Sequence, residues 1–221
     1  MDNSYFQDDI REREMIALFD LVKDMSEGRI GVDAFLELEG NRFPFELKTT
    51  SKASVTTVRD FSPVHIEKWQ GKHWLFGFYQ GTYVYYKYGS PNMMIPWIKE
   101  KSEYIRPDFE LANIVSKKLT LYDLYQMCGK KNTYSYQDAR RIQKQQYKKD
   151  KYLALQDMKN GYSRTRMLEI LNDRTKYLIE RGSTLNNPHI PASYFSDWEK
   201  ITDNHAKRLR ELVKQYLNEI S

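Results

Sequence analysis

The sequence has one cysteine, Cys128, among its 221 residues. A single thiol excludes both a disulfide framework and a thiolate metal cluster within one chain. Long hydrophobic runs are also lacking, since no apolar segment approaches the roughly 20 residues that cross a bilayer. The first residues, MDNSYFQDDIREREM, are polar and acidic and predict neither a secretory signal nor a transit peptide. We therefore expect a cytoplasmic protein with no membrane partner.

Motifs for nucleotide and histidine–metal chemistry are missing too. The sequence contains no GxxxxGK[ST] run and no glycine-rich turn between a strand and a helix, so we expect no nucleotide cofactor. The histidines, His65, His73, His189 and His205, lack metal-ligand spacing with one another or with Cys128. This spacing disfavours a metal centre built on histidines.

What the sequence does have is charge, divided unevenly along the chain. It is 40% hydrophobic and 29% charged, which is typical of a globular protein, and its net charge is +5. Residues 1–40 hold 11 Asp and Glu against 4 Lys and Arg, whereas residues 117–181 hold 16 Lys and Arg against 7 Asp and Glu. This division predicts a metal-binding region beside a surface that binds a polyanion. The alternative is that the surface Lys and Arg only keep the protein soluble.

Hydrophobic spacing in the first quarter of the chain predicts a helix followed by a hairpin. Apolar residues recur at helical intervals over residues 9–27, and Gly28 lies where a helix would stop. Two short apolar segments, Val32–Leu38 and Phe43–Thr50, flank a turn at Glu39–Asn41. This arrangement predicts a β-hairpin or two adjacent strands.

The rest of the chain continues with both kinds of element. Ser62 as N-cap and Pro63 at the first position open a short helix, and the aromatic segment His73–Gly89 predicts a second pair of strands. Helical patterns then cover residues 108–116, 120–128, 135–159, 163–181 and 195–219. The order predicts an α/β (α+β) fold with a mainly helical C-terminal half.

Three residues of the predicted hairpin carry the candidate chemistry. Because side chains alternate across a strand, Glu46 and Lys48 point to one face while Phe45 and Leu47 are able to face the core. The return of the hairpin brings Asp33, on the preceding strand, beside Glu46. Two carboxylates and an ammonium next to a core are costly without a cation, and hard carboxylate oxygens suit Mg²⁺. The pattern therefore predicts a magnesium site.

The alternative is that these side chains form an ordinary exposed strand face. Glutamate-x-lysine triplets arise by chance, and near matches occur at Glu67-Lys68 and Lys99–Lys101. The order of elements favours the metal site: an acidic helix, a strand with an aspartate, a turn, a strand with the triplet, and then the hydroxyls of Thr49, Thr50 and Ser51.

Asp33, followed about a dozen residues later by Glu46-Leu47-Lys48, resembles the motif of the PD-(D/E)xK nuclease superfamily. The short chain resembles a type II restriction endonuclease of that superfamily. The resemblance covers mainly residues 10–90, and Val32 stands where the motif has its proline.

The resemblance implies a restriction-endonuclease-like core, with a mixed central sheet flanked by helices. That catalytic core would span residues 1–110, and a helical region for DNA binding or dimerisation would span residues 111–221, packed on the core as one unit. The implied function is Mg²⁺-dependent hydrolysis of DNA phosphodiester bonds at a short specific double-stranded sequence.

The resemblance also implies roles for individual groups. Asp33, Glu46 and the Leu47 backbone carbonyl would hold one or two Mg²⁺ ions, and Lys48 would contact the attacking water or a phosphate oxygen. Glu12 or Glu14 of the first helix is the candidate ligand of a second metal; the alternative is that both lie on a solvated helix face.

Three segments are candidates for DNA contact. Lys52 and Arg59 lie in the polar loop that follows the triplet, where they would contact the DNA backbone. Arg164 and Arg166 open the helix after Gly161, as in the recognition helix of a helix-turn-helix. A solvated loop and a plain structural helix pair are the alternatives.

The third segment is the polar loop that contains Asn186 and Asn187, which would read adenine or only build turns. The last helix has an apolar stripe that packs on the core or mediates dimerisation. A homodimer is implied by the resemblance, because two-fold protein symmetry matches a palindromic site. A repair or junction-resolving nuclease and a DNA-binding protein that does not cleave are the alternative functions.

Overall fold

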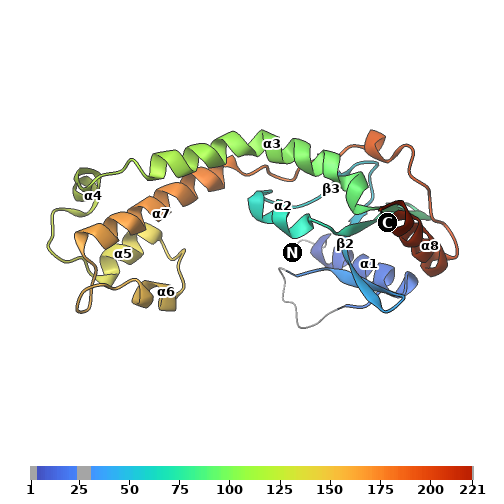
Figure 1. Ribbon diagram of the computed structural model, residues 1–221, viewed down its shortest axis with the longest axis horizontal. Helices are drawn as coiled ribbons and strands as arrows, with labels where there is room; N and C mark the ends of the chain where they lie inside the picture. Colours follow the sequence, from blue (N-terminus) through green and yellow to red (C-terminus); the bar gives the residue numbers. More distant parts are fainter. Residues whose placement is uncertain (1–3, 24–30, 221) are drawn as a thin grey trace. The chain divides into compact units, whose positions relative to one another are not determined.

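The computed structural model describes residues 4–23 and 31–220 of the chain (Figure 1). Two compact units are present. The first comprises the described residues of Met1–Ser102 and Leu185–Ser221, and the second is Glu103–Thr184. Among the helices of the described ranges, none is both long enough and apolar enough to cross a membrane.

The first unit is built on a four-stranded mixed sheet, which confirms the predicted mixed sheet flanked by helices. The strand order is β1 (Ala34–Leu38), β2 (Asn41–Thr50), β4 (His73–Gln80) and β5 (Tyr83–Gly89). β1 and β2 form the predicted antiparallel hairpin, and so do β4 and β5. β2 and β4 are parallel, and the chain between them contains β3 (Val55–Thr56) and α2 (Pro63–Trp69).

The two faces of this sheet pack against different helices. On one face, Phe45 and Leu47 share a core cluster with Met15 of α1 (Ser4–Leu18) and with Leu209 of α8 (His205–Ile220). On the other face the strands present aromatic rings. Trp74 of β4 lies 5.0 Å from Trp69 of α2, ring centre to ring centre.

The remaining elements of the first unit are short segments and part of a long helix that continues into the second unit. Phe76 of β4 lies 5.0 Å from Phe195 of the 3₁₀ turn η1 (Ala192–Phe195), and β6 (His189–Ile190) pairs with β3. The long helix α3 (Pro91–Ser116) begins in the first unit and ends in the second. The helix expected over residues 108–116 therefore starts much earlier, at Pro91.

The second unit is helical. Its complete helices are α4 (Leu121–Cys128), α5 (Tyr136–Gln143), α6 (Lys149–Ala154) and α7 (Arg164–Ser183). Figure 1 shows α5 running beside α7. Side chains from these helices and their connections form one buried cluster: Leu124, Cys128, Tyr134, Ala139, Ile142, Tyr152, Tyr162, Met167, Ile170 and Leu171.

The single helix expected over residues 135–159 is wrong, because α5 ends at Gln143 and α6 begins at Lys149. The burial pattern gives the reason. Ile142 and Tyr152 are buried in the cluster and Tyr147 packs against it, so these residues recur at intervals of five. In a continuous helix residues five apart point about 140° away from each other. A break lets all three reach the same core.

Two other helix boundaries are corrected. The first helix ends at Leu18 because Asp20 takes a left-handed backbone conformation, with φ of 53°, and Val22 then pairs with Phe35 of β1. The last part of that expected helix, from residue 24, and its stop at Gly28 lie outside the described residues. The last helix begins at His205 rather than 195, because Ile201 pairs with the sheet.

The unit boundaries differ from the expected division at residue 110. The chain returns to the first unit after the second: β6 pairs with β3, Ile201 pairs with Tyr86 of β5, and Val213 of α8 enters the first core. The sheet and its covering helix are therefore assembled from both ends of the sequence.

Candidate active site

β2 places the triplet Glu46-Leu47-Lys48 as the alternation of side chains along a strand predicts. Phe45 and Leu47 belong to the core cluster on one face. Glu46 and Lys48 lie together on the other face, where the Lys48 ammonium donates to Glu46 Oε1 at 2.8 Å. Glu46 is itself buried, with 2% of its side chain exposed, and Lys48 keeps 16% exposed. The triplet is therefore not an ordinary exposed strand face.

Asp33 stands one residue before β1 rather than on it. The register pairs Ala34 with Phe45, so the next position of the hairpin sets Asp33 opposite Glu46. Asp33 Oδ2 accepts a hydrogen bond from the Leu47 backbone nitrogen at 2.9 Å. This bond attaches the aspartate to the triplet strand even though Val32 occupies the position of the motif's proline.

Three oxygens meet at the Lys48 ammonium. Its nitrogen is 2.8 Å from Glu46 Oε1, 3.0 Å from the Leu47 carbonyl oxygen and 3.8 Å from Asp33 Oδ2. These are the three groups expected to bind metal. The ammonium occupies the point where their oxygens converge.

Two further lysines hold the other oxygen of Glu46. Lys72, which is 4% exposed and directly precedes β4, donates to Oε2 at 3.1 Å. Lys68, on α2, lies 3.6 Å from the same oxygen. One buried carboxylate is therefore surrounded by three ammonium groups.

These contacts shift the pKa values of the cluster. Burial alone would raise the pKa of Glu46, but the positive charges of Lys48, Lys68 and Lys72 outweigh burial and lower it to about 2. Burial also disfavours the charged form of Lys48, yet Glu46 and Asp33 together hold its pKa above the usual range. For Lys72, burial prevails over the attraction of Glu46 and lowers the pKa.

The donor set fits a hard divalent cation. Carboxylate and carbonyl oxygens are the ligands that Mg²⁺ takes, and Mg²⁺ keeps several waters, so two carboxylates and one carbonyl are enough protein ligands. Within residues 4–23 and 31–220 no group of three or more His, Cys, Asp and Glu side chains has the geometry of a metal site. Asp33, Glu46 and the Leu47 carbonyl are the residues that would hold the ion.

A cleft of about 660 Å³ opens beside Lys48. Asp33 and Glu46 contact Lys48 but do not line the cleft, so the lysine separates the carboxylates from it. Most of the lining groups are polar and four are cationic: Arg11, Glu12, Leu47, Lys48, Thr49, Thr50, Ser51, Lys52, Thr56, Thr57, Val58, Arg59 and Asn187. The cleft therefore suits an anionic ligand.

The cleft gathers several of the residues expected to contact DNA or a second metal. Lys52, Arg59 and Asn187 all line it, although Asn187 is far from the others in sequence. Glu12 also lines it, and its carboxylate bonds Lys23 at 3.0 Å.

Other expected site residues lie elsewhere. Glu14 is exposed and is near Tyr79, where its charge helps to raise the pKa of the phenol, and it does not line the cleft. Asn186 is exposed next to Asn187 without lining the cleft. Arg164 and Arg166 open α7 in the second unit.

Both of these arginines make contacts within the second unit. The Arg164 guanidinium donates to the Lys131 carbonyl at 3.0 Å and also contacts Asn132. Arg166 is paired with Glu169 on the next turn of α7. Ser163 caps the helix, accepting from the Arg166 backbone nitrogen at 3.1 Å.

The sequence did not identify Lys68 and Lys72. Their place depends on the parallel pairing of β2 with β4, in which Glu46 is the register partner of Trp74. Alternation then puts Lys72 on the same face as Trp74 and Glu46. A lysine directly before a strand that pairs with the strand of Glu46 was the available signal, but the pairing itself could not be read from the sequence.

No protein-family model matches this sequence, and no curated protein matches it either.

Proposed function

We propose that this protein is a Mg²⁺-dependent DNA endonuclease whose site is built from Asp33, Glu46, the Leu47 carbonyl and Lys48. The observation that carries the proposal is the convergence of three oxygens on the Lys48 ammonium, at the wall of a cationic cleft. Oxygens arranged around one cation are also a suitable ligand set for a hard divalent cation. When bound, Mg²⁺ would supply the positive charge that polarises a phosphodiester and acidifies a water molecule.

Lys48 would act as a hydrogen-bond donor in this chemistry. Because neighbouring carboxylates hold its pKa above the usual range, its ammonium is charged at neutral pH and donates hydrogen bonds rather than accepting a proton. For the oxygens to bind a metal, the ammonium has to leave Glu46 and move into the cleft. There it would hold a phosphate oxygen or orient the attacking water.

Lys72 and Lys68 would act on Glu46 rather than on the substrate. Their contacts with Oε2 fix the carboxylate, so that Oε1 faces Lys48. A carboxylate held in one orientation by buried partners is prepared for its ligand before the ligand arrives.

We further propose that cleavage is specific for a short double-stranded sequence and that a homodimer carries it out. The triplet's resemblance to type II restriction endonucleases supports this refinement. The cleft supports it with cations at Arg11, Lys52 and Arg59 that are able to contact phosphates beside the scissile bond.

The direct test is incubation of a supercoiled plasmid with the full chain and Mg²⁺, and with EDTA in parallel. Discrete fragments that form only with Mg²⁺ are expected. A smear or a preference for branched substrates would indicate a repair or junction-resolving nuclease instead. Binding without any cleavage would overturn the proposal.

Two substitutions separate metal binding from chemistry. Glu46→Gln should abolish both cleavage and the rise in melting temperature that Mg²⁺ causes. Lys48→Ala should reduce cleavage at least about 100-fold, the usual effect of losing a catalytic donor, while Mg²⁺ still raises the melting temperature. Glu37→Gln on β1 is the matched control, because Glu37 is exposed and does not line the cleft. Wild-type cleavage by both site variants would show that the site is wrong.

A further inference from the structure

α5 has two faces of opposite character. Ala139, Ile142 and Gln143 are buried against the core of the second unit. The Gln143 amide donates to the Ile170 carbonyl of α7 at 2.6 Å. One face of the helix is therefore fixed to α7, and the other is left to solvent.

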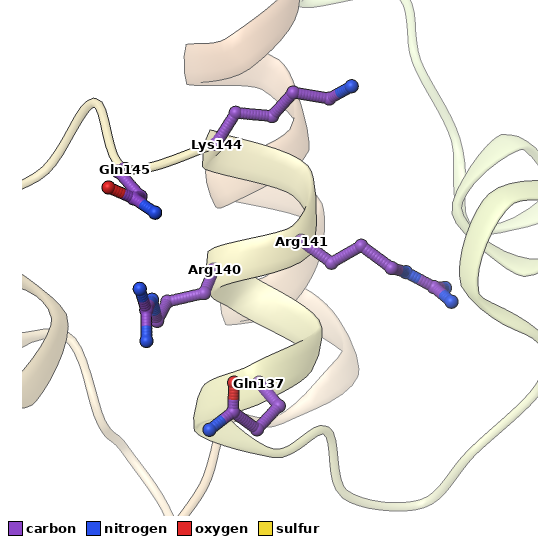
Figure 2. Close-up of a pocket in the computed structure, with 5 residues that line it drawn as sticks. All are labelled: Gln137, Arg140, Arg141, Lys144 and Gln145. Carbon is purple, nitrogen blue, oxygen red and sulfur yellow. The ribbon is translucent and has the colours of Figure 1, made fainter.

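The solvent face carries only polar and basic groups around a hollow. Gln137, Arg140, Arg141, Lys144 and Gln145 line an open depression of about 370 Å³. Figure 2 shows these side chains projecting from α5 and its C-terminal end, with Arg140 and Arg141 pointing to different sides of the helix. Gln137, Arg140 and Lys144 follow the helical spacing of three and four residues that aligns side chains on one face.

The charge of this face is not balanced by acidic neighbours. In the part of the chain that the structure describes, neither arginine nor Lys144 forms an ion pair with an acidic side chain. Residues 130–151 contain eight Lys and Arg but only two Asp. One of these, Asp138, accepts from the Ser135 backbone nitrogen to cap α5 and pairs with Lys131.

The whole second unit shares this imbalance. Residues 103–184 hold 17 Lys and Arg against 10 Asp and Glu, a net charge of +7, while the complete chain has +5. The excess positive charge of the protein therefore belongs to this unit. A basic surface of this kind attracts a polyanion.

The backbone that ends α5 is held in an unfavourable conformation. Lys144 and Gln145 both have positive φ, 46° and 67°, a region that residues other than glycine rarely occupy. Two such residues in succession are costly, and strain of this kind concentrates where a side chain has to be aimed. Here it places both side chains at the hollow that Arg140 and Gln137 line.

We propose that this face of α5 enters the major groove of duplex DNA and reads base edges. The proposal rests on the proposed endonuclease function and names the part of the chain that gives it sequence preference. Arg140 has the fork of donors that matches guanine O6 and N7, and Gln137 and Gln145 have the amide that matches adenine N6 and N7. Arg141 points to the other side of the helix, where it donates to the Met127 carbonyl at 3.2 Å. Lys144 supplies a phosphate contact.

The test measures binding rather than cleavage. The full chain is equilibrated in EDTA with a library of short random-sequence DNA duplexes, and the bound fraction is sequenced. Wild type should enrich a short motif. Gln137→Ala or Arg140→Ala should weaken binding to that motif by about 5-fold to about 150-fold, the usual value of one bidentate base contact, and should relax preference at one position of the motif. Lys144→Ala should weaken all sequences alike and reduce the salt dependence of binding by about one counterion.

Lys117→Ala is the matched control, because it removes the same charge from an exposed position of the second unit that does not line the hollow. Gln145→Gly is the second variant. Glycine adopts the left-handed backbone conformation without strain, so this variant should raise the melting temperature and still reduce base preference. A purely structural role for Gln145 predicts no change in preference.

The outcomes also separate this inference from the proposed function. If α5 variants bind and select DNA like wild type while the plasmid is still cut, the inference is overturned and the endonuclease stands. If the motif is selected through α5 but no plasmid is cut with Mg²⁺, the endonuclease fails and the recognition surface stands. Tighter binding of RNA than of duplex DNA through the same residues would also overturn the inference.

Discussion

Replacing Glu46 with glutamine provides a test of the electrostatics of the site, because the sign of its effect on stability is fixed by the structure. Glu46 is 2% exposed, and its carboxylate lies between 2.8 Å and 3.6 Å from the ammonium groups of Lys48, Lys72 and Lys68. The substitution keeps the shape of the side chain and removes the charge. Three ammonium groups, of which that of Lys72 is buried, then lose the carboxylate that they share, while Asp33 remains 3.8 Å from Lys48.

The magnitude follows from the pKa of Glu46. A carboxyl whose pKa falls from 4.5 to about 2 on folding stabilises the native state by about 3 kcal/mol at neutral pH. Because the folded pKa is the lower one, this stabilisation is present above about pH 4.5 and is lost as the pH falls towards about 2. Removal of one partner of a buried ion pair costs about 3–5 kcal/mol. We expect a loss of that size.

Removing a lysine together with the carboxylate should restore part of the stability. Lys72→Met alone leaves Glu46 paired with Lys48 and Lys68, so its cost should be smaller. In the double variant Glu46→Gln with Lys72→Met, no ammonium is left buried at position 72. The two costs should therefore not add, and the coupling should fall within the range of about 0.5–3 kcal/mol seen for contacting residues.

The assay is urea denaturation at neutral pH followed by tryptophan fluorescence. All four tryptophans belong to the first unit, so the signal reports its unfolding alone: Trp69, Trp74, Trp97 and Trp198. Glu37→Gln is again the control for an exposed strand position. Unchanged or increased stability of Glu46→Gln, or additive costs in the double variant, would refute the reasoning.

Three further predictions concern single residues of the two units. Burial lowers the pKa of His73 from 6.5 to about 4, so the stability that its neutral form contributes is complete above about pH 6.5 and falls with acidification. Between about pH 7 and about pH 5, wild type should therefore lose about 2 kcal/mol more than His73→Gln in urea denaturation, and equal losses would contradict this. A Cβ on Gly161 would lie 2.6 Å from the Tyr134 carbonyl oxygen, so Gly161→Ala should cost about 1–3 kcal/mol by circular dichroism, and a neutral result would show that the backbones do not approach so closely. Arg164→Ala removes the donor to the Lys131 carbonyl and should lower the free energy of unfolding by about 0.5–1.5 kcal/mol while leaving DNA affinity unchanged. Lost affinity with unchanged stability would instead support Arg164 as a DNA contact.

Elements with local sequence signals were predicted well. Both hairpins, the short helix after Ser62 and the helix after Ser163 have caps, turns or alternation within a few residues of one another, and all are present. Helix boundaries were predicted less well where tertiary packing competes with local preference. Residues 144–148 have no proline or glycine to stop a helix, yet packing of Tyr147 and Tyr152 in the core cluster of the second unit requires the chain to turn there.

For the candidate site, local patterning alone predicts which groups share the strand face. Alternation puts Glu46 and Lys48 together, and a two-strand hairpin returns Asp33 to them, because each step depends only on neighbouring residues. The groups that surround them depend on how distant segments pack. The parallel pairing of β2 with β4 brings Lys72 to Glu46, and the return of the chain after the second unit brings Asn187 to the cleft. Contacts between distant segments depend on how whole elements pack, and no spacing within the sequence records that.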